Sequence, residues 1–197
     1  HVLDFGGNAM ITMDTHQSGT ERCGEVVEKF EDKDEFFDIV VNIQGDEPCI
    51  NIDAINKLVL SVGNFKKIDY LQAVSKLTDQ NKILDTSLVK VTISDNSEVL
   101  YYSRLPIPFP MGEHSINKLI YFRCLGLYLY SQDLLLEYLK MAPTSLEILE
   151  NIEQLRLIEN RVLINAIEVN DDGISVDTPN DLIIIKEQYR DCFEEPF

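Results

Sequence analysis

Residues 37–48 read Phe-Asp-Ile-Val-Val-Asn-Ile-Gln-Gly-Asp-Glu-Pro, a nearly continuous apolar run that ends in a polar turn. The β-branched residues Ile39–Val41 within it are typical of a strand that is buried on both faces of a parallel sheet. Glycine, aspartate and proline then form the turn, so the strand is expected to end near Ile43. Ligands of open α/β sheets bind just beyond the carboxyl ends of such strands. The turn around Asp46 is therefore the leading candidate for a functional site.

Strand and helix patterns alternate along the rest of the chain, as in α/β proteins. Strands are predicted where β-branched and aromatic residues cluster, and helices where apolar residues recur every three or four positions. A polar turn between two apolar runs predicts a hairpin at 89–103. The fold class is therefore α/β, with a mostly parallel central sheet and a β-hairpin insertion. The predicted strands are 9–13, 37–43, 70–77, 125–130 and 162–169, and the predicted helices begin at 18–20, cover 51–62, 131–140 and 145–160, and begin again at 178.

The charge balance excludes one class of partner. The chain has 34 acidic and 17 basic residues and a formal net charge of −17. Such a surface repels phosphate backbones, so no nucleic-acid partner is expected. An enzyme of this charge that handles anionic substrates needs local basic groups or a divalent metal ion to offset the field.

The chain shows no membrane or secretion signal. Its longest apolar clusters are strand-sized, well short of the roughly 18 residues that span a bilayer. No basic segment followed by an apolar one marks a signal peptide. The four cysteines are isolated and form no C-x-x-C pair, which favours reduced thiols over a zinc or redox site. We therefore expect a cytoplasmic protein without membrane insertion.

Two acids are candidate magnesium ligands. Asp46 follows the best predicted strand, and Asp177 follows a short β-like stretch and precedes a helix. That helix is predicted to begin at Thr178, with Pro179 in its first turn and Asp181 at the position of a capping-box acid. Magnesium takes one or two carboxylates and leaves its other positions to water and phosphate oxygens. Taken alone, each acid is better explained without a function, Asp46 as a turn former and Asp177 as an acid beside a helix start.

Other segments combine functional side chains with turns or helices. The turn 18–22, Ser-Gly-Thr-Glu-Arg, enters a helix that Thr20 can cap, and its backbone N–H groups can bind an anion beside Arg22. Arg104 follows an apolar strand and precedes a proline-rich loop, and arginine suits bidentate carboxylate recognition. Tyr128 and Tyr130 alternate with leucines, so they share one face of a strand. A plain helix cap, a surface ion pair and structural tyrosines explain the same residues without a function.

Taken together and in this order, the motifs resemble those of the 3-deoxy-manno-octulosonate cytidylyltransferases (CMP-Kdo synthetases). The set runs along the whole chain, and the Gln-Gly-Asp-Glu-Pro motif is its most specific member. The matching segments are Phe5–Gly7, Ser18–Arg22, Val41–Pro48, Tyr102–Arg104 with Pro106–Pro108, Gly126–Tyr128, Glu153–Arg156 and Val176–Pro179.

The resemblance implies a fold, a reaction and a set of roles. The fold is a glycosyltransferase-A-like nucleotidyltransferase domain over 1–197, in which 88–130 form a sugar-binding and dimerisation insertion, and the protein is a homodimer. The reaction joins CTP and the acid sugar 3-deoxy-manno-octulosonate (Kdo) to give CMP-Kdo and pyrophosphate for lipopolysaccharide synthesis, with Mg²⁺ as cofactor. The implied roles are Asp46 and Asp177 as magnesium ligands, Ser18, Thr20 and Arg22 near CTP, and Gln44, Arg104, Tyr128, Glu153 and Gln154 in the sugar site, with Arg104 facing the sugar carboxylate.

The chain departs from the family pattern in two ways. It begins after the N-terminal strand and the glycine- and basic-rich loop that hold the triphosphate, so this polypeptide alone is expected to be inactive or nearly so. Cys124 stands where the family usually carries histidine in the sugar site, and a thiol is a weaker hydrogen-bond partner than imidazole. Two alternatives stay open: a cytidylyltransferase for another, sialic-acid-like sugar, and a non-catalytic remnant that only dimerises or binds a partner.

Overall fold

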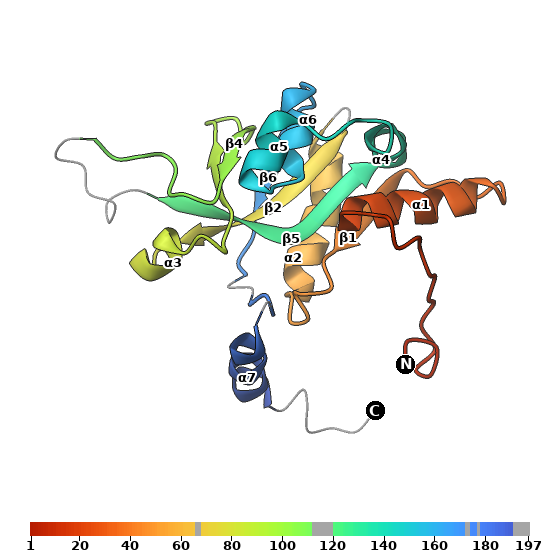
Figure 1. The fold of residues 1–197 in the computed structure, drawn as a ribbon, viewed down its shortest axis with the longest axis horizontal. Helices are drawn as coiled ribbons and strands as arrows, with labels where there is room; N and C mark the ends of the chain where they lie inside the picture. Colours follow the sequence, from red (N-terminus) through yellow and green to blue (C-terminus); the bar gives the residue numbers. More distant parts are fainter. Residues whose placement is uncertain (66–67, 112–119, 172–173, 177, 191–197) are drawn as a thin grey trace.

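The protein is described by a computed structural model that covers residues 1–65, 68–111, 120–171, 174–176 and 178–190. Its centre is one mixed sheet of six strands, with helices on both faces (Figure 1). The strands follow the order β4 (Val99–Ser103), β3 (Lys90–Ile93), β5 (Tyr121–Ser131), β2 (Tyr70–Leu77) and β6 (Ile164–Glu168), and β1 (Ile39–Ile43) also pairs with β5.

The long strand β5 organises this sheet. One of its edges pairs with β2 from Tyr121 to Tyr130. The other edge is shared by two strands, since β3 pairs with Phe122 and Arg123 while β1 pairs with 127–131. Neither strand ladder covers residues 124–126 of that edge. The sheet therefore splits between β3 and β1, and a pocket opens at the split.

The sheet was predicted to be mostly parallel, and this prediction of strand direction is wrong. Among the described strands only β2 and β6 pair in parallel, whereas β5 runs antiparallel to β1, β2 and β3. The burial predicted for both faces of Ile39–Val41 is also wrong, because these residues are only half-buried in β1, which pairs with β5 alone among the described strands. Because β5 lies between β1 and β2, these two strands point the same way but are not hydrogen-bonded to each other.

The helices form a layer on each side of the sheet. Alternate residues of β5 show this arrangement, because Leu127 and Leu129 pack with α2 whereas Tyr128 and Tyr130 join the core on the opposite face. The predicted common face of the two tyrosines is thus confirmed. The tyrosine side carries α1 (Gly19–Glu31), α4 (Gln132–Tyr138), α5 (Ser145–Glu150) and α6 (Gln154–Glu159), and the leucine side carries α2 (Ile52–Leu60), which continues as a short 3-10 helix, η1 (Ser61–Asn64).

Three local predictions are corrected. Residues 9–13 form no strand, because their backbone is tied to side chains of α1: Met13 N donates to Glu25, and Ile11 O accepts from Lys29. The helix α1 is capped by Ser18, whose Oγ accepts from Glu21 N at 3.2 Å, and not by Thr20. The helix predicted at 145–160 breaks at Asn151, which adopts a left-handed φ of 54° and separates α5 from α6.

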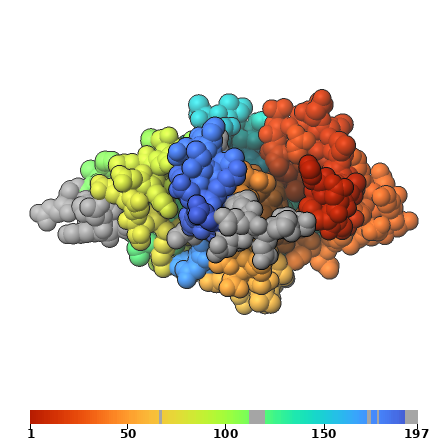
Figure 2. Space-filling view, turned by 90° about the horizontal axis from the view of Figure 1, so that it is seen from below, coloured from red at the N-terminus to blue at the C-terminus, as the bar shows by residue number. Residues whose placement is uncertain are grey.

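The remaining helices lie at the periphery of the molecule. The helix α3 (Gln80–Leu84) is a short connector, and α7 (Pro179–Gln188) projects from the lower face, where Figure 2 shows it in blue. Thr178 caps α7 with the predicted capping box. None of the described helices has both the length and the apolar character that crossing a membrane requires. No disulfide joins the cysteines of the described part of the chain, Cys23, Cys49 and Cys124.

A buried arginine ties the helices of the tyrosine side together. Arg156 of α6 is only 4% exposed, and its guanidinium makes two hydrogen bonds to the Glu147 carboxylate of α5, one of them 2.8 Å long from Nε. It also lies 3.5 Å from Glu21 of α1 and stacks on the Tyr138 ring of α4 at 4.4 Å. Four helices therefore share one charged group, which ordinary surface ion pairs do not do.

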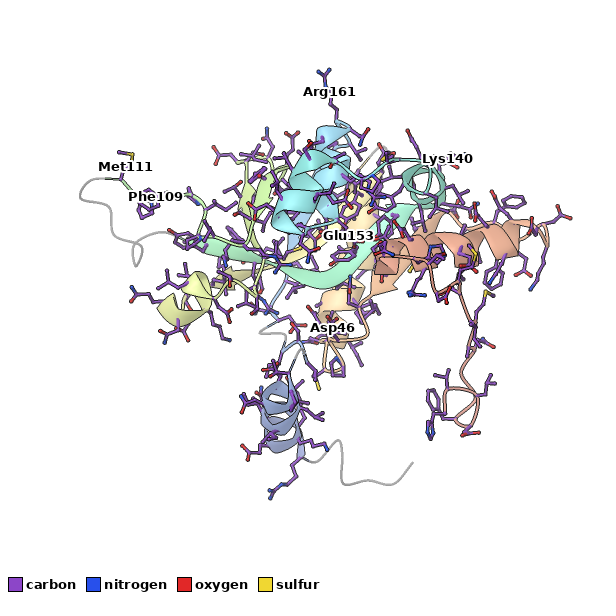
Figure 3. All side chains as sticks on the ribbon, in the orientation of Figure 1. Asp46, Phe109, Met111, Lys140, Glu153 and Arg161 are labelled. Atoms are coloured by element: carbon purple, nitrogen blue, oxygen red, sulfur yellow. The ribbon has the colours of Figure 1, made fainter. Side chains whose placement is uncertain are left out.

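Replacing Arg156 with methionine is expected to destabilise the protein by about 3 kcal/mol or more, because the Glu147 carboxylate stays buried without its cation. Arg161→Met makes the same chemical change at an exposed side chain that points into solvent (Figure 3). Chemical denaturation of the two variants measures the difference. Equal unfolding free energies would contradict the structural role of Arg156.

Candidate active site

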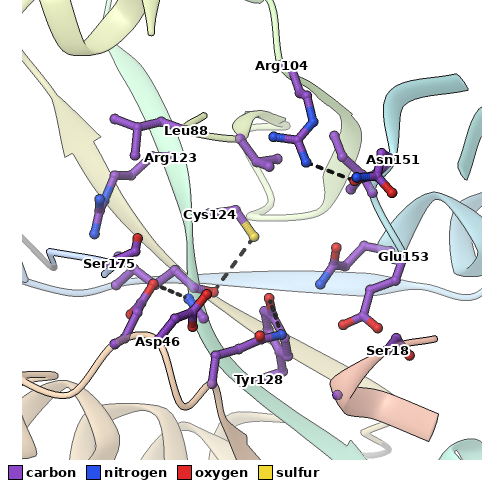
Figure 4. A pocket seen from close by; sticks show the side chains of 18 of the residues that line it. Ser18, Asp46, Leu88, Arg104, Arg123, Cys124, Tyr128, Asn151, Glu153 and Ser175 are labelled. Atoms are coloured by element: carbon purple, nitrogen blue, oxygen red, sulfur yellow. Dashed lines mark hydrogen bonds between the residues drawn. The ribbon is translucent and has the colours of Figure 1, made fainter. Parts of the chain in front are cut away.

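A pocket of about 580 Å³ opens where β3 and β1 separate along β5 (Figure 4). Its floor is formed by residues 124–126 and Tyr128 of β5. One wall is the turn after β1, another is the loop 87–89 with Arg104, and a third comes from the start of α1 and the α5–α6 connection. Of the residues predicted from sequence, the pocket is lined by Ser18, Gln44, Asp46, Arg104, Cys124, Tyr128, Glu153 and Gln154.

Two hydrogen bonds to the backbone of Gly126 in β5 hold the turn after β1 in place. Gln44 N donates to Gly126 O at 2.8 Å, and Gly126 N donates to the Glu47 carboxylate at 2.7 Å. A Cβ at position 126 would lie 2.8 Å from Gln44 Cβ and 3.1 Å from Glu47 Cδ. Only glycine therefore allows the turn to approach this closely. The result places Asp46 in the pocket wall.

Glu153 faces Ser18 across one side of the pocket (Figure 4). Its Oε1 accepts from the Thr20 hydroxyl at 2.9 Å, whereas its Oε2 has no hydrogen-bond partner in the described part of the chain. Burial raises the pKa of the Glu153 carboxyl, and the nearby hydroxyls of Ser18 and Thr20 partly offset this effect. Thr20 itself is buried behind the pocket and does not line it.

Two further residues of the pocket wall carry buried polar atoms. Within the described residues, Glu47 Oε2 and Gln154 Nε2 are buried and have no hydrogen-bond partner. Gln44 Nε2 donates to the Tyr128 hydroxyl at 3.4 Å, near the upper limit for a hydrogen bond. Buried polar groups in native proteins are normally satisfied, so these atoms indicate a ligand with both donors and acceptors.

Arg104 lines the pocket, but most of its donors are occupied. Its Nε donates to Glu150 O, one terminal nitrogen donates to Asn151 O, and the other donates to the carbonyls of Thr86 and Ser87. Four of the five N–H groups of the guanidinium are thus engaged. Arg104 connects two walls of the pocket and retains one donor for a ligand.

A buried lysine completes the loop that Arg104 holds. Lys90 is fully buried, and its ammonium donates to Asp85 O at 2.6 Å and to Leu88 O at 2.7 Å. Burial lowers the pKa of Lys90, and the Asp85 carboxylate counteracts this. Lys90 and Arg104 together satisfy the carbonyls of four successive residues, 85–88. No local pattern indicates this role, because Lys90 lies within an ordinary strand pattern.

Only one of the two predicted metal ligands can be placed. Asp46 lines the pocket together with Ser175, and Asp46 O accepts from Val176 N at 2.7 Å. Asp177, the next residue, lies outside the described part of the chain. No cluster of three His, Cys, Asp or Glu that could hold a metal occurs among the described residues. Magnesium does not require such a cluster, since one or two carboxylates beside phosphate oxygens suit it.

The residues predicted near the nucleotide are spread over three environments. Ser18 lines the pocket at the first turn of α1. Arg22 instead donates to Thr12 Oγ1 at 2.8 Å and to Met13 O at 3.0 Å, outside the pocket. Thr20 contacts Glu153, which belongs to the predicted sugar site.

Comparison with known proteins decides the family. The family model described as cytidylyltransferase matches residues 1–167. The 3-deoxy-manno-octulosonate cytidylyltransferase of Fusobacterium nucleatum is 38% identical over 181 residues, which are 92% of this chain and 71% of that protein. Its counterpart from Chlamydia pneumoniae is 36% identical over 197 residues, which are 100% of this chain and 74% of that protein. The chain belongs to the 3-deoxy-manno-octulosonate cytidylyltransferase family.

A solved structure supports the same assignment. The CMP:2-keto-3-deoxy-manno-octonic acid synthetase complexed with CTP superposes with a TM-score of 0.86 at 32% sequence identity, over 96% of this chain and 75% of that one. The predicted α/β nucleotidyltransferase fold is thereby confirmed, and the chain is a nucleotidyltransferase. The names of these relatives specify this one sugar acid, so neither the sialic-acid-like substrate nor the non-catalytic remnant is favoured.

Several pocket residues escaped sequence reasoning. Arg123 precedes Cys124 in β5 and donates from Nε to Ser75 Oγ at 3.2 Å while also lining the pocket. Glu47 was part of the quoted motif, but nothing in the sequence separated it from Asp46.

Cys124 is where the cytidylyltransferase resemblance expects histidine, and its thiol makes one long contact of 3.8 Å to Leu125 O. Burial raises the pKa of Cys124 well above its usual value, so the thiol stays protonated.

Gly126→Ala is expected to lower kcat/KM about 100-fold, because the added methyl group displaces the turn that carries Asp46. Gly63→Ala is the matched control, since a Cβ there meets no atom within 4 Å. Steady-state kinetics of the full-length protein with CTP and Kdo checks the effect. Wild-type turnover in Gly126→Ala would show that the close approach is not required.

Lys90→Met is expected to cost about 1–3 kcal/mol of stability, because the carbonyls of Asp85 and Leu88 lose their donor. The loop 85–88 should also become more mobile, which amide hydrogen exchange of residues 85–88 measures. Lys57→Met on the exposed side of α2 is the control. The same unfolding free energy and exchange rates in both variants would contradict the role of Lys90.

Proposed function

We propose that this pocket is where the chain transfers CMP from CTP to Kdo, releasing pyrophosphate. The observation that carries the proposal is that Glu47 Oε2, Glu153 Oε2 and Gln154 Nε2, buried atoms on residues that line the pocket, have no hydrogen-bond partner among the described residues. Two acceptors and one donor suit a polyhydroxylated ligand, because each sugar hydroxyl both donates and accepts. Membership of the cytidylyltransferase family adds the nucleotide and the reaction class.

The reaction needs little covalent chemistry from the protein. The anomeric hydroxyl of Kdo forms a bond to the α-phosphorus of CTP and loses its proton, and the bond from that phosphorus to the β-phosphate oxygen breaks. Positioning and charge stabilisation therefore supply most of the acceleration. Asp46 and Asp177 would hold Mg²⁺, which neutralises the charge that collects on the phosphate oxygens.

The remaining residues divide between the two substrates. Ser18 at the first turn of α1 presents backbone N–H groups on the nucleotide side, and the segment that Arg22 holds is adjacent to it. Gln44, Tyr128, Glu153 and Gln154 form the sugar wall with Cys124 beside them. Arg104 offers its one remaining donor to the sugar carboxylate and so contributes a single hydrogen bond there, not a bidentate pair.

We also propose that the protein is a homodimer in the cytoplasm. The segment 88–130, proposed as the sugar-binding and dimerisation insertion, exposes large apolar side chains, and Phe109 and Met111 lie far from the pocket (Figure 3). Apolar side chains gathered in one exposed segment favour an interface with another chain. Sedimentation equilibrium tests this directly, and a monomer at micromolar concentration would exclude it.

Asp46→Asn is expected to reduce pyrophosphate release to background, because an amide loses the charge that a magnesium ligand needs. The variant should unfold at nearly the wild-type denaturant concentration, since Asp46 is exposed to the pocket. The assay uses the full-length protein with CTP, Kdo and Mg²⁺, and Asp95→Asn in the exposed β3–β4 turn is its control. Wild-type turnover in Asp46→Asn would exclude the metal role.

A further inference from the structure

A chain of hydroxyl groups runs from the core to the pocket carboxylate. Thr20 is 2% exposed, and its Oγ1 donates to Glu153 Oε1 at 2.9 Å. The same Oγ1 lies 2.6 Å from the hydroxyl oxygen of Tyr130. A threonine hydroxyl has a single proton, so when Thr20 donates to Glu153 it must accept from Tyr130. The donors therefore point in one direction, from Tyr130 through Thr20 to Glu153.

The inner end of this chain is rigid. Tyr130 is 1% exposed, and its ring packs edge-on against Tyr70 at a centroid distance of 4.9 Å and an interplanar angle of 85°. Asn42, which belongs to β1, donates from Nδ2 to the Tyr130 hydroxyl at 3.5 Å. The hydroxyl of Tyr130 is thus held by the packing of its ring within the sheet and by Asn42 of the neighbouring strand.

The outer end leaves one oxygen for a ligand. Thr20 occupies Glu153 Oε1, while Glu153 Oε2 is buried and has no partner in the described residues. Aligned hydrogen bonds in a low-dielectric interior polarise one another, so the two inner donors stabilise the carboxylate in one rotamer. A carboxylate fixed in this way loses little conformational freedom when a ligand binds.

We propose that Thr20 and Tyr130 are positioning residues that hold Glu153 so that its Oε2 accepts a hydroxyl of the acid sugar. This inference rests on the proposed function of the pocket. The proposal assigns Thr20 to the sugar side of the pocket, whereas the family resemblance implied that it lies near CTP. The first turn of α1 then serves both substrates. Ser18 faces the nucleotide, and Thr20 supports Glu153, whose carboxylate binds the sugar.

The test measures KM for each substrate separately in the full-length protein with CTP, Kdo and Mg²⁺. Thr20→Val removes the hydroxyl at nearly constant shape, and Thr20→Ser keeps it. The Thr20→Val variant is expected to raise KM for Kdo about tenfold or more, as loss of a hydrogen bond to a charged group does, with KM for CTP unchanged within about twofold. Thr20→Ser is expected to behave as wild type.

A double-mutant cycle separates the relay from general packing. Tyr130→Phe should raise KM for Kdo by less than Thr20→Val does, and the double variant should be no worse than Thr20→Val alone, because both act through one chain of bonds. Thermal unfolding identifies any variant that fails to fold, in which case Tyr130→Phe and Thr20→Ser carry the test.

Each outcome decides a separate claim. If wild type does not turn over Kdo, the proposed function fails and this inference fails with it. If wild type is active but Thr20→Val leaves KM for Kdo unchanged, only the relay is wrong. KM values for CTP and Kdo that rise together, additive effects in the double variant, or Thr20→Ser kinetics equal to those of Thr20→Val would also overturn it.

Discussion

The contact between the turn after β1 and the backbone of Gly126 is the constraint on which the pocket depends. The two hydrogen bonds at Gly126 join β1 to β5 beyond the end of their ladder, at the point where β3 has left the same edge. A side chain at position 126 would collide with Gln44 and Glu47. The split in the sheet therefore becomes a cavity with a polar wall, and Asp46 reaches that wall because the turn cannot move away.

The basic groups of the pocket are already largely engaged before any substrate binds. Arg156 is paired with Glu147, and most N–H groups of Arg104 donate to backbone carbonyls. The sugar wall consequently consists mainly of neutral donors and acceptors and of Glu153. In a chain with a net charge of −17, we propose that a metal ion held by aspartate and the helix N–H groups offset the phosphate charges, while the α5–α6 connection recognises the sugar hydroxyls.

Sequence reasoning reached the parts of the molecule that local physics determines. The strand 70–77, the hairpin within 89–103 and the capping box at Thr178 were predicted correctly, because alternation, turn residues and caps are local signals. The direction of pairing was wrong, since no local pattern shows that β5 lies between β1 and β2. The break at Asn151 was missed because apolar spacing continues across it.

The site was predictable only in part. Asp46 followed from its place after a strand, whereas Glu153 and Gln154 lie on an unremarkable polar helix and were found through family resemblance alone. Lys90, Arg123, Gly126 and the link from Thr20 to Tyr130 depend on which strands meet at one edge of β5, and that arrangement is non-local. Contacts of this kind require coordinates.

A crystal structure of the full-length protein with CTP and Kdo bound would test the central claim most directly. We expect sugar hydroxyls within hydrogen-bond distance of Glu153 Oε2 and Gln154 Nε2, with the turn after β1 still hydrogen-bonded to Gly126. A sugar bound elsewhere, or a pocket in which those two atoms still lack partners, would contradict it.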